Sequence, residues 1–241
     1  MTWLPLAALL VGGYAAATIS GAAGFGGALL LLPIATWAVG AKEAIPLLTL
    51  GQLVGNLSRA TLGWRLIRWK PALLFCVGAI PAALVGAVLF VAVPGASILR
   101  SVGVFLILVV LLRRTKFRNI AMPESVVAPG GFVVGFLSAV VGSAGPLGAM
   151  LFLGLGLPAG AYVATEAVTA VAMHLTKSTV YSSFSLVTTQ TIWIGALLSL
   201  VMVAGSWTGK KIIESLPKDK FELVVELLLL SSATSLLIFA R

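Results

Sequence analysis

Residues 20–34 read SGAAGFGGALLLLPI, with four glycines in the seven positions from Gly21 to Gly27 and an apolar run that reaches Pro33. Glycine weakens a helix because the unfolded chain has more conformational freedom at a glycine than at any other residue. A backbone opened in hydrocarbon is costly because water cannot satisfy its polar groups. The stretch therefore predicts an interrupted membrane helix and raises the question of what satisfies its open backbone.

The composition is that of an integral membrane protein. The 241 residues are 60% hydrophobic and 10% charged, and their mean hydropathy is +1.12. Soluble domains carry about 25% charged residues. We therefore expect an all-α polytopic membrane protein that lies in the lipid bilayer of the cell inner membrane, with the first segment retained as structure.

The charges and the rare residues limit the function classes. The net charge of +9 is scattered between apolar segments, which argues against nucleic acid as a partner. Its main explanation is that Lys and Arg collect in cytoplasmic loops, with an attraction for anions as a second contribution. One histidine and one cysteine, Cys76, exclude an internal disulfide and make a metal site unexpected, so we predict no metal and no cofactor.

Eight apolar segments are expected, and a straight span needs about 20 residues. The first and fifth are longer than that, and glycines interrupt both of them. The segments cover residues 4–38, 44–63, 71–93, 96–113, 126–157, 161–184, 189–209 and 221–240.

The two halves of the chain repeat. GGYAAATISGAAGFGGALLLLPI begins at Gly12, and GGFVVGFLSAVVGSAGPLGAMLF begins at Gly130, 118 residues later. We expect repeats over residues 1–118 and 119–241 in one membrane unit, because two glycine-interrupted segments in matching positions point to a transporter site. At this offset Ser20 falls on Ser138, Gly24 on Gly142, Asn56 on His174 and Arg59 on Lys177.

The basic clusters predict the orientation. RLIRWK at 65–70, RRTKFR at 113–118 and KKIIESLPKDK at 210–220 should all be cytoplasmic. They share one side if segments one and five are re-entrant hairpins, which makes the second repeat inverted and puts both termini outside.

The order of these motifs resembles the sulfite exporter TauE/SafE family. The likeness rests on GAAGFGGALLLLP, VGSAGPLGAMLFLGLGLP, HLTKSTVY at 174–181 and the basic loop RLIRWK, and it spans nearly the whole chain. It implies a transporter of sulfite, sulfoacetate and other organosulfonates. The chain departs from the family pattern at GSAGPLG, at His174 and at Glu166, and these departures bear on the substrate or the coupling ion.

The glycine motifs are candidate substrate-binding tips. Backbone N–H groups at the start of a half-helix carry about half a positive charge, and glycine lets an oxyanion approach them. The alternative is that these small residues only allow close helix packing. The tip residues that we predict to bind substrate are Gly24, Phe25, Gly26 and Gly27 in the first motif, and Gly142, Ser143, Ala144 and Gly145 in the second.

Polar residues inside two spans complete the candidate site. Segment two supplies Gln52, Asn56 and Arg59, and segment six supplies His174 and Lys177. A buried lysine is costly in a membrane, so we expect Lys177 to lie between the tips as the full positive charge for the anion. The alternative is that Lys177, like Arg59, extends to the headgroups.

Glu166 and His174 are candidates for carrying a coupling proton. The ordinary pKa of a histidine, near 6.5, suits that role, although a structural histidine is an equal alternative, and Glu166 has the alternative of pairing with Lys177. The sequence therefore predicts a secondary transporter that exports small anions, coupled to a proton or to the membrane potential, and not an enzyme. An uptake permease and a passive anion channel are the alternatives, and a homodimer is possible.

Overall fold

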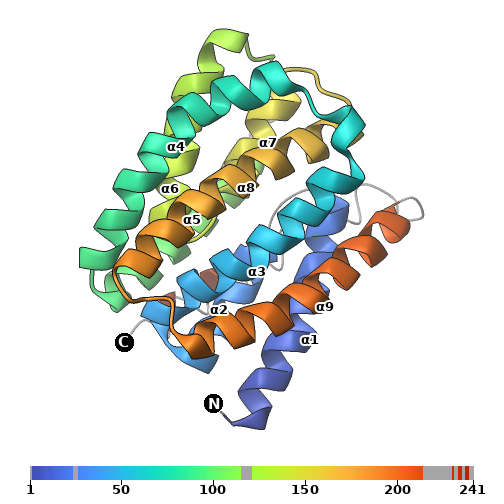
Figure 1. Ribbon diagram of the computed structural model, residues 1–241. Coiled ribbons are helices and arrows are strands. Elements are labelled where there is room, and N and C mark those ends of the chain that lie inside the picture. Colours follow the sequence, from blue (N-terminus) through green and yellow to red (C-terminus); the bar gives the residue numbers. More distant parts are fainter. Residues whose placement is uncertain are drawn as a thin grey trace.

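The computed structural model describes residues 2–23, 27–114, 121–213, 230, 233–234 and 237–238. Within these ranges the chain forms helices and no strand (Figure 1). The sequence therefore predicted the all-helical class correctly. The cluster at 113–118, the cluster at 210–220 and the segment at 221–240 lie wholly or mostly outside the described residues.

The first glycine motif separates two helices. Helix α1 (Trp3–Ala23) ends before it, and α2 (Gly27–Val39) begins after it. The two run antiparallel, because a Cβ on Gly12 would contact Ile34 while a Cβ on Gly27 would contact Ser20. Gly24, Phe25 and Gly26 lie outside the described residues.

The second glycine motif has the same arrangement. Helix α6 (Val127–Val141) follows the short 3-10 helix η3 (Glu124–Val126), and α7 (Gly145–Gly154) returns beside it. Gly142 ends α6 with φ 91°, a backbone conformation that favours glycine. The N–H of Met122 donates to the carbonyl of Gly154 at 2.8 Å, so the pair closes as a helical hairpin.

Single helices make up the rest of the described chain, and their bounds agree with the expected segments to within a few residues. They are α3 (Ala41–Leu62), the 3-10 helix η1 (Trp64–Leu66), α4 (Trp69–Ala92), α5 (Gly95–Arg114), α8 (Ala159–Ser183) and α9 (Thr189–Ile213).

Helices α3 and α8 cross the middle of the molecule in opposite directions. The end of α3 lies at the start of α8, because a Cβ on Gly63 would lie 2.8 Å from the Cβ of Ala164. The N–H of Arg68, just before α4, donates to Thr165 Oγ1 at 3.0 Å. These two helices place their polar residues between the other helices, where many of those residues are buried.

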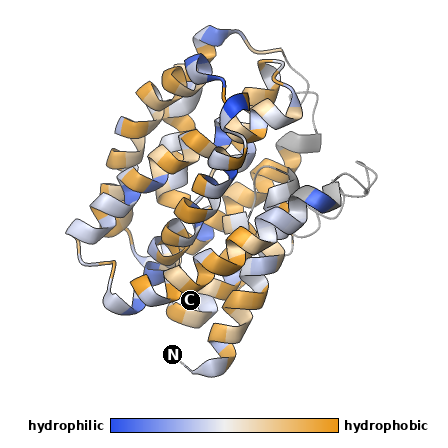
Figure 2. Cartoon of the chain, turned by 45° about the vertical axis from the view of Figure 1, so that its right-hand side comes forward, coloured by the Kyte–Doolittle hydropathy of each residue, from blue (hydrophilic) through white to orange (hydrophobic). Residues whose placement is uncertain are grey.

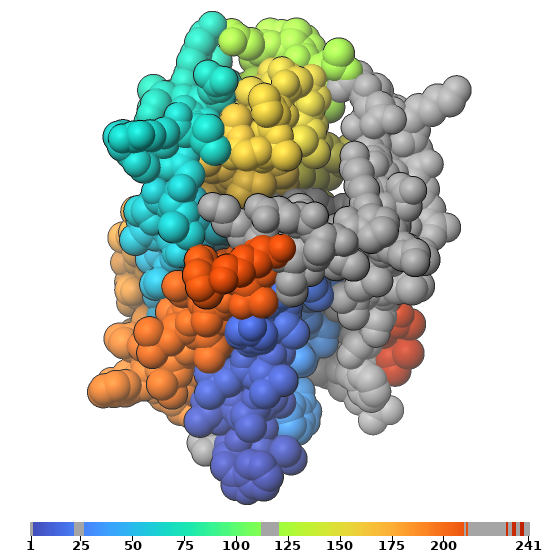
Figure 3. Space-filling model, turned by 90° about the vertical axis from the view of Figure 1, so that its right-hand side faces the viewer, coloured from blue at the N-terminus to red at the C-terminus, as the bar shows by residue number. Residues whose placement is uncertain are grey.

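The outer helices pack in pairs through glycines. Helix α4 lies along α6, and α1 lies along α9. Figure 3 shows α1 and α9 side by side. A Cβ on Gly78 would lie 2.0 Å from the carbonyl of Ala128, and one on Gly205 would lie 2.5 Å from the carbonyl of Tyr14. Helix α9 also packs on α3, as α4 packs on α8. Exchanging the two halves of the chain therefore leaves the set of main packing pairs unchanged.

Four helices are long and apolar enough to cross a membrane, within the part of the chain that the structure describes. They cover Trp3–Gly21, Trp69–Ala92, Glu124–Val141 and Thr189–Gly209. Apolar residues dominate the helices (Figure 2), as expected for a multi-pass membrane protein. All six tryptophans are more than half exposed, a pattern typical of interfacial anchors: Trp3, Trp37, Trp64, Trp69, Trp193 and Trp207.

The basic residues that follow α3 and those at the end of α9 lie on one side of the helix bundle. Helices α3 and α9 run parallel, because Gly51 faces Leu198 and Gly55 faces Met202. The basic loop at 65–70 follows α3, and Lys211 lies in the last turn of α9 over the ring of Trp207. Both therefore lie at the same side, as the charge pattern predicted.

Candidate functional site

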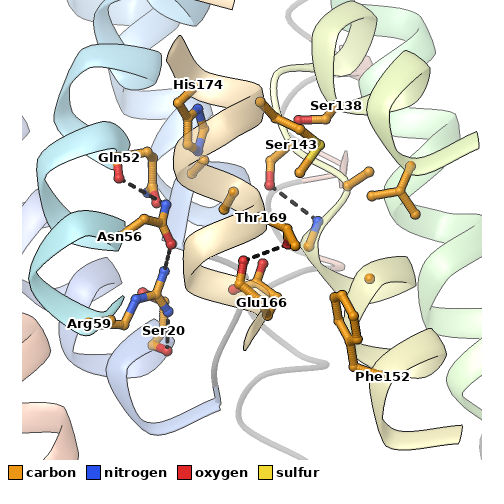
Figure 4. A pocket seen from close by; sticks show the side chains of 18 of the residues that line it. Ser20, Gln52, Asn56, Arg59, Ser138, Ser143, Phe152, Glu166, Thr169 and His174 are labelled. Carbon is orange, nitrogen blue, oxygen red and sulfur yellow. Dashed lines mark hydrogen bonds between the residues drawn. The ribbon is translucent and has the colours of Figure 1, made fainter. Parts of the chain in front are cut away.

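A cavity of about 30 Å³ lies between the ends of the two hairpins (Figure 4). Helices α3, α4 and α8 and both hairpins line it, and most of its polar groups come from α3 and α8. Its lining residues are Ser20, Gly27, Ala28, Gln52, Asn56, Arg59, Phe75, Val134, Ser138, Ser143, Ala144, Gly145, Gly148, Phe152, Glu166, Thr169, Ala170, Met173 and His174. The sequence therefore identified most of the polar lining, and both glycine motifs contribute to one site.

The hairpins direct helix N-termini at this cavity. Helix α2 begins at Gly27 and α7 begins at Gly145, and both glycines line the cavity. Pro146 occupies the first turn of α7, where its missing N–H costs no hydrogen bond. The N–H of Gly145 makes only a long contact of 3.5 Å with Ser143 Oγ. The start of α7 therefore offers a weakly engaged donor and the positive end of a helix dipole.

Arg59 is the cation that faces the cavity. It is half-buried on α3, and its Nη1 donates to the carbonyl of Ser20 at 3.1 Å while Nη2 donates to Asn56 Oδ1. Asn56 is fixed in turn, because its Nδ2 donates to the carbonyl of Gln52 at 2.8 Å. This chain of hydrogen bonds holds the guanidinium at the cavity wall and at the end of α1.

Lys177 does not line the cavity, contrary to the sequence prediction. Its side chain is fully buried, and its ammonium donates to Ser138 Oγ at 3.1 Å and to the carbonyls of Ser138 and Gly142 at 3.2 Å each. It does not extend to the headgroups either. One turn later, Tyr181 Oη donates to the carbonyl of Ala139 at 2.9 Å. Lys177 and Tyr181 therefore cap the end of α6.

These caps explain how the glycine breaks are tolerated. The last four carbonyls of a helix have no partner within it, and in a membrane no bulk water replaces the missing partner. Ser20 lies in the last turn of α1, and Ser138 lies in the last turn of α6. Arg59 serves the first end, and Lys177 with Tyr181 serves the second. Because helix C-termini carry negative potential, the two cations also shield the cavity from a field that opposes anions.

Three buried polar atoms of the lining have no hydrogen-bond partner within the described chain. They are Gln52 Nε2, Glu166 Oε2 and His174 Nδ1. Each side chain belongs to a residue that is at most 7% exposed. A buried polar group without a partner costs about 1–3 kcal/mol. Three such atoms around one cavity indicate a site that a polar ligand completes.

The remaining predicted residues fall in different places. Gly142 shapes the second tip by its positive φ but does not line the cavity. Gly27 lines the cavity, yet a Cβ there would lie 3.0 Å from Ser20 Oγ, so close packing also requires a small residue. The sequence interpretation missed Ser20 and Ser138 as site residues, although the repeat offset aligned them. It also missed Thr169 and Phe152, which no pattern marked.

The lining carries polar and charged groups of several kinds. Among the described residues, no three of His, Cys, Asp or Glu come together as a metal site. Cys76 lies on α4 and is not part of the cavity lining. The lining offers one forked cation, amide, hydroxyl and imidazole groups and one carboxylate, which together suit a small oxyanion and a proton.

Comparison with known proteins agrees with this description. The family model described as sulfite exporter TauE/SafE matches residues 9–236. Neither the curated proteins nor the solved structures include a significant match to the chain. The match covers nearly all of the 241 residues, so the chain belongs to the sulfite exporter TauE/SafE family of membrane transporters.

Proposed function

We propose that this protein is a secondary transporter of small sulfur oxyanions or organosulfonates, of the sulfite or sulfoacetate type, in the inner membrane. Its export of these anions is coupled to a proton or to the membrane potential. The observation that carries the proposal is the cavity between the hairpin ends with Arg59 at its wall.

The lining fits the chemistry of an oxyanion. A guanidinium presents planar donors that match two oxygens of one anion, and such charge-assisted bonds are about twice as strong as neutral ones. Gln52 Nε2 is a buried donor without a partner in the described structure, and the Gly145 N–H is weakly engaged. At about 30 Å³ the cavity favours an anion of few atoms, so a larger organosulfonate requires it to widen.

In this proposal residues 1–118 and 119–241 form two inverted repeats, and their arrangement lets the cavity open to one side of the membrane and then to the other. The hairpins α1–α2 and α6–α7 are re-entrant and enter from opposite faces. The antiparallel α3 and α8 and the exchange symmetry of the packing pairs support this arrangement. The ion pair of Lys70 with Glu124 at 2.5 Å, which joins the starts of α4 and η3 at the basic face, supports it too.

Impermeant maleimide labelling tests this topology. In a Cys76→Ala background, a cysteine at Arg68 should react only from the cytoplasm. Cysteines at Ser97 and Ser185, at the other ends of the helices, should react only from outside. Labelling of Arg68 and Ser185 positions from the same side would contradict the inverted arrangement.

A substrate screen in proteoliposomes tests the transport function. Sulfite, thiosulfate, sulfoacetate and taurine are offered to wild-type vesicles, to empty vesicles and to vesicles with Arg59→Met. We expect saturable flux of at least one anion, with counterflow that requires unlabelled anion on the far side. A flux that does not saturate and carries a large current would indicate a passive channel instead.

A further inference from the structure

Glu166 places a carboxylate in the anion cavity. It lies on α8, is 7% exposed and has Oε2 without a hydrogen-bond partner in the described structure. Its neighbour Thr169 donates to the backbone carbonyl of Glu166 at 2.8 Å and not to the carboxylate. A fixed negative charge here opposes anion binding, so its presence requires an explanation.

The charged and titratable groups around Glu166 are few. Helix α3 contributes Arg59, and α8 itself contributes Tyr162, His174, Lys177 and Tyr181, of which Lys177 and Tyr181 donate to the end of α6. The 3-10 helix η1, which packs on α8, carries Arg65, and the backbone N–H of Arg68 donates to Thr165. The described residues of α6 and α7 contribute none. Helix α4 carries Lys70, which pairs with Glu124, and Cys76, which lies outside the lining.

The net charge of the cavity lining therefore depends on whether Glu166 is protonated. With the carboxylate ionised, Arg59 and Glu166 sum to zero, so a monovalent anion leaves one uncompensated negative charge in a low-dielectric site, which is strongly unfavourable. A proton on Glu166 removes that charge, and the anion and Arg59 then balance. A proton on His174 instead adds a second positive charge to the lining beside Arg59 and leaves the carboxylate charged.

We propose that Glu166 carries the coupling proton, and that one proton and one monovalent anion occupy the cavity and cross the membrane together. This inference rests on the proposed function. The proton comes from water on the loading side, forms an O–H bond on the carboxylate and returns to water on the release side. Each cycle moves no net charge. A pH gradient drives transport and the membrane potential does not, and export runs when the outward anion gradient exceeds an inward proton gradient.

The test uses full-length protein in vesicles and radiolabelled methanesulfonate, a monovalent anion with no titratable group near neutral pH. Any proton that moves with it is therefore carried by the protein. A pH gradient or a potassium–valinomycin potential is imposed separately. For wild type we expect about tenfold accumulation per pH unit, one proton per anion by an entrapped pH dye, and no response to the potential.

Four variants locate the proton carrier. Glu166→Gln should lose the response to the pH gradient and gain a response to the potential, because the anion then crosses without a proton. Glu166→Asp should keep the wild-type pattern. His174→Gln should keep the pH response. Glu43→Gln, an exposed carboxylate at the start of α3, is the matched control and should change nothing.

Each outcome decides. Wild-type counterflow that responds to the potential and not to pH overturns the inference and leaves the transport function standing. Loss of the pH response in His174→Gln while Glu166→Asp is normal also overturns it. If Glu166→Gln fails to fold, the proton count of wild type and of Glu166→Asp decides. No saturable flux of methanesulfonate or any anion of the screen refutes the proposed function itself.

Discussion

Arg59 and Lys177 occupy matching positions in the two halves of the chain, yet only one of them faces the cavity. Each is 39 residues after the serine whose carbonyl it caps, Ser20 for Arg59 and Ser138 for Lys177. The Lys177 ammonium donates to Ser138 Oγ and to the carbonyls of Ser138 and Gly142, all at the end of α6. The forked guanidinium caps α1 and still lines the cavity. The comparison shows that one repeat position can serve backbone capping alone or capping together with binding.

The largest effect should come from Arg59→Met. It removes the cation of the cavity wall and the cap on Ser20, and loss of one partner of a buried charged pair costs about 3–5 kcal/mol. Anion affinity should therefore fall roughly 100-fold or more, measured by calorimetry in detergent. Arg59→Lys keeps the charge but not the fork, and its affinity should lie between the two. Wild-type affinity in Arg59→Met would show that Arg59, like Lys177, caps a helix end and does not bind the anion.

Lys177→Met should affect stability more than binding. It removes the ammonium that donates to the carbonyls of Ser138 and Gly142, and each buried group left without a donor costs about 1–3 kcal/mol. We expect a lower unfolding temperature in a thermal shift assay and an affinity within about threefold of wild type, which is under 1 kcal/mol. A large loss of affinity with unchanged thermal stability would give Lys177 the direct binding role that its geometry argues against.

Tyr181→Phe should have the smallest effect. It removes one hydrogen bond to the carbonyl of Ala139 and should lower the free energy of unfolding by about 1 kcal/mol. Tyr14→Phe is the matched control, because the Tyr14 hydroxyl meets Thr208 Oγ1 at an exposed site and caps no helix end. Equal destabilisation by the two changes would show that capping at α6 has no special weight.

The sequence predicted the helices and the breaks because composition and glycine spacing act locally. Gly142 ends α6 at the break that the second motif predicted, and Pro146 lies in the first turn of α7. Gln52 and Asn56 line the cavity, as their shared helix face implied. The orientation that the basic clusters favoured stays a prediction, which the maleimide labelling tests.

The role of Lys177 could not be predicted from the residues near it in the sequence. A buried lysine needs acceptors, and both an anion and a helix end supply them, so its helical position alone does not choose between the two. The choice depends on where α6 ends relative to α8, which is a tertiary fact. Phe152 and Thr169 entered the lining for the same reason, since α7 and α8 bring them there together.

The most direct test of the account is to locate a bound oxyanion. Crystals soaked in selenite, a heavier analogue of sulfite, give an anomalous signal from selenium alone. The account predicts a peak between the hairpin ends, within hydrogen-bond reach of the Arg59 guanidinium and near the start of α7, and no peak in Arg59→Met crystals. A peak beside the Lys177 ammonium, in place of its contacts with Ser138 and Gly142, would contradict it.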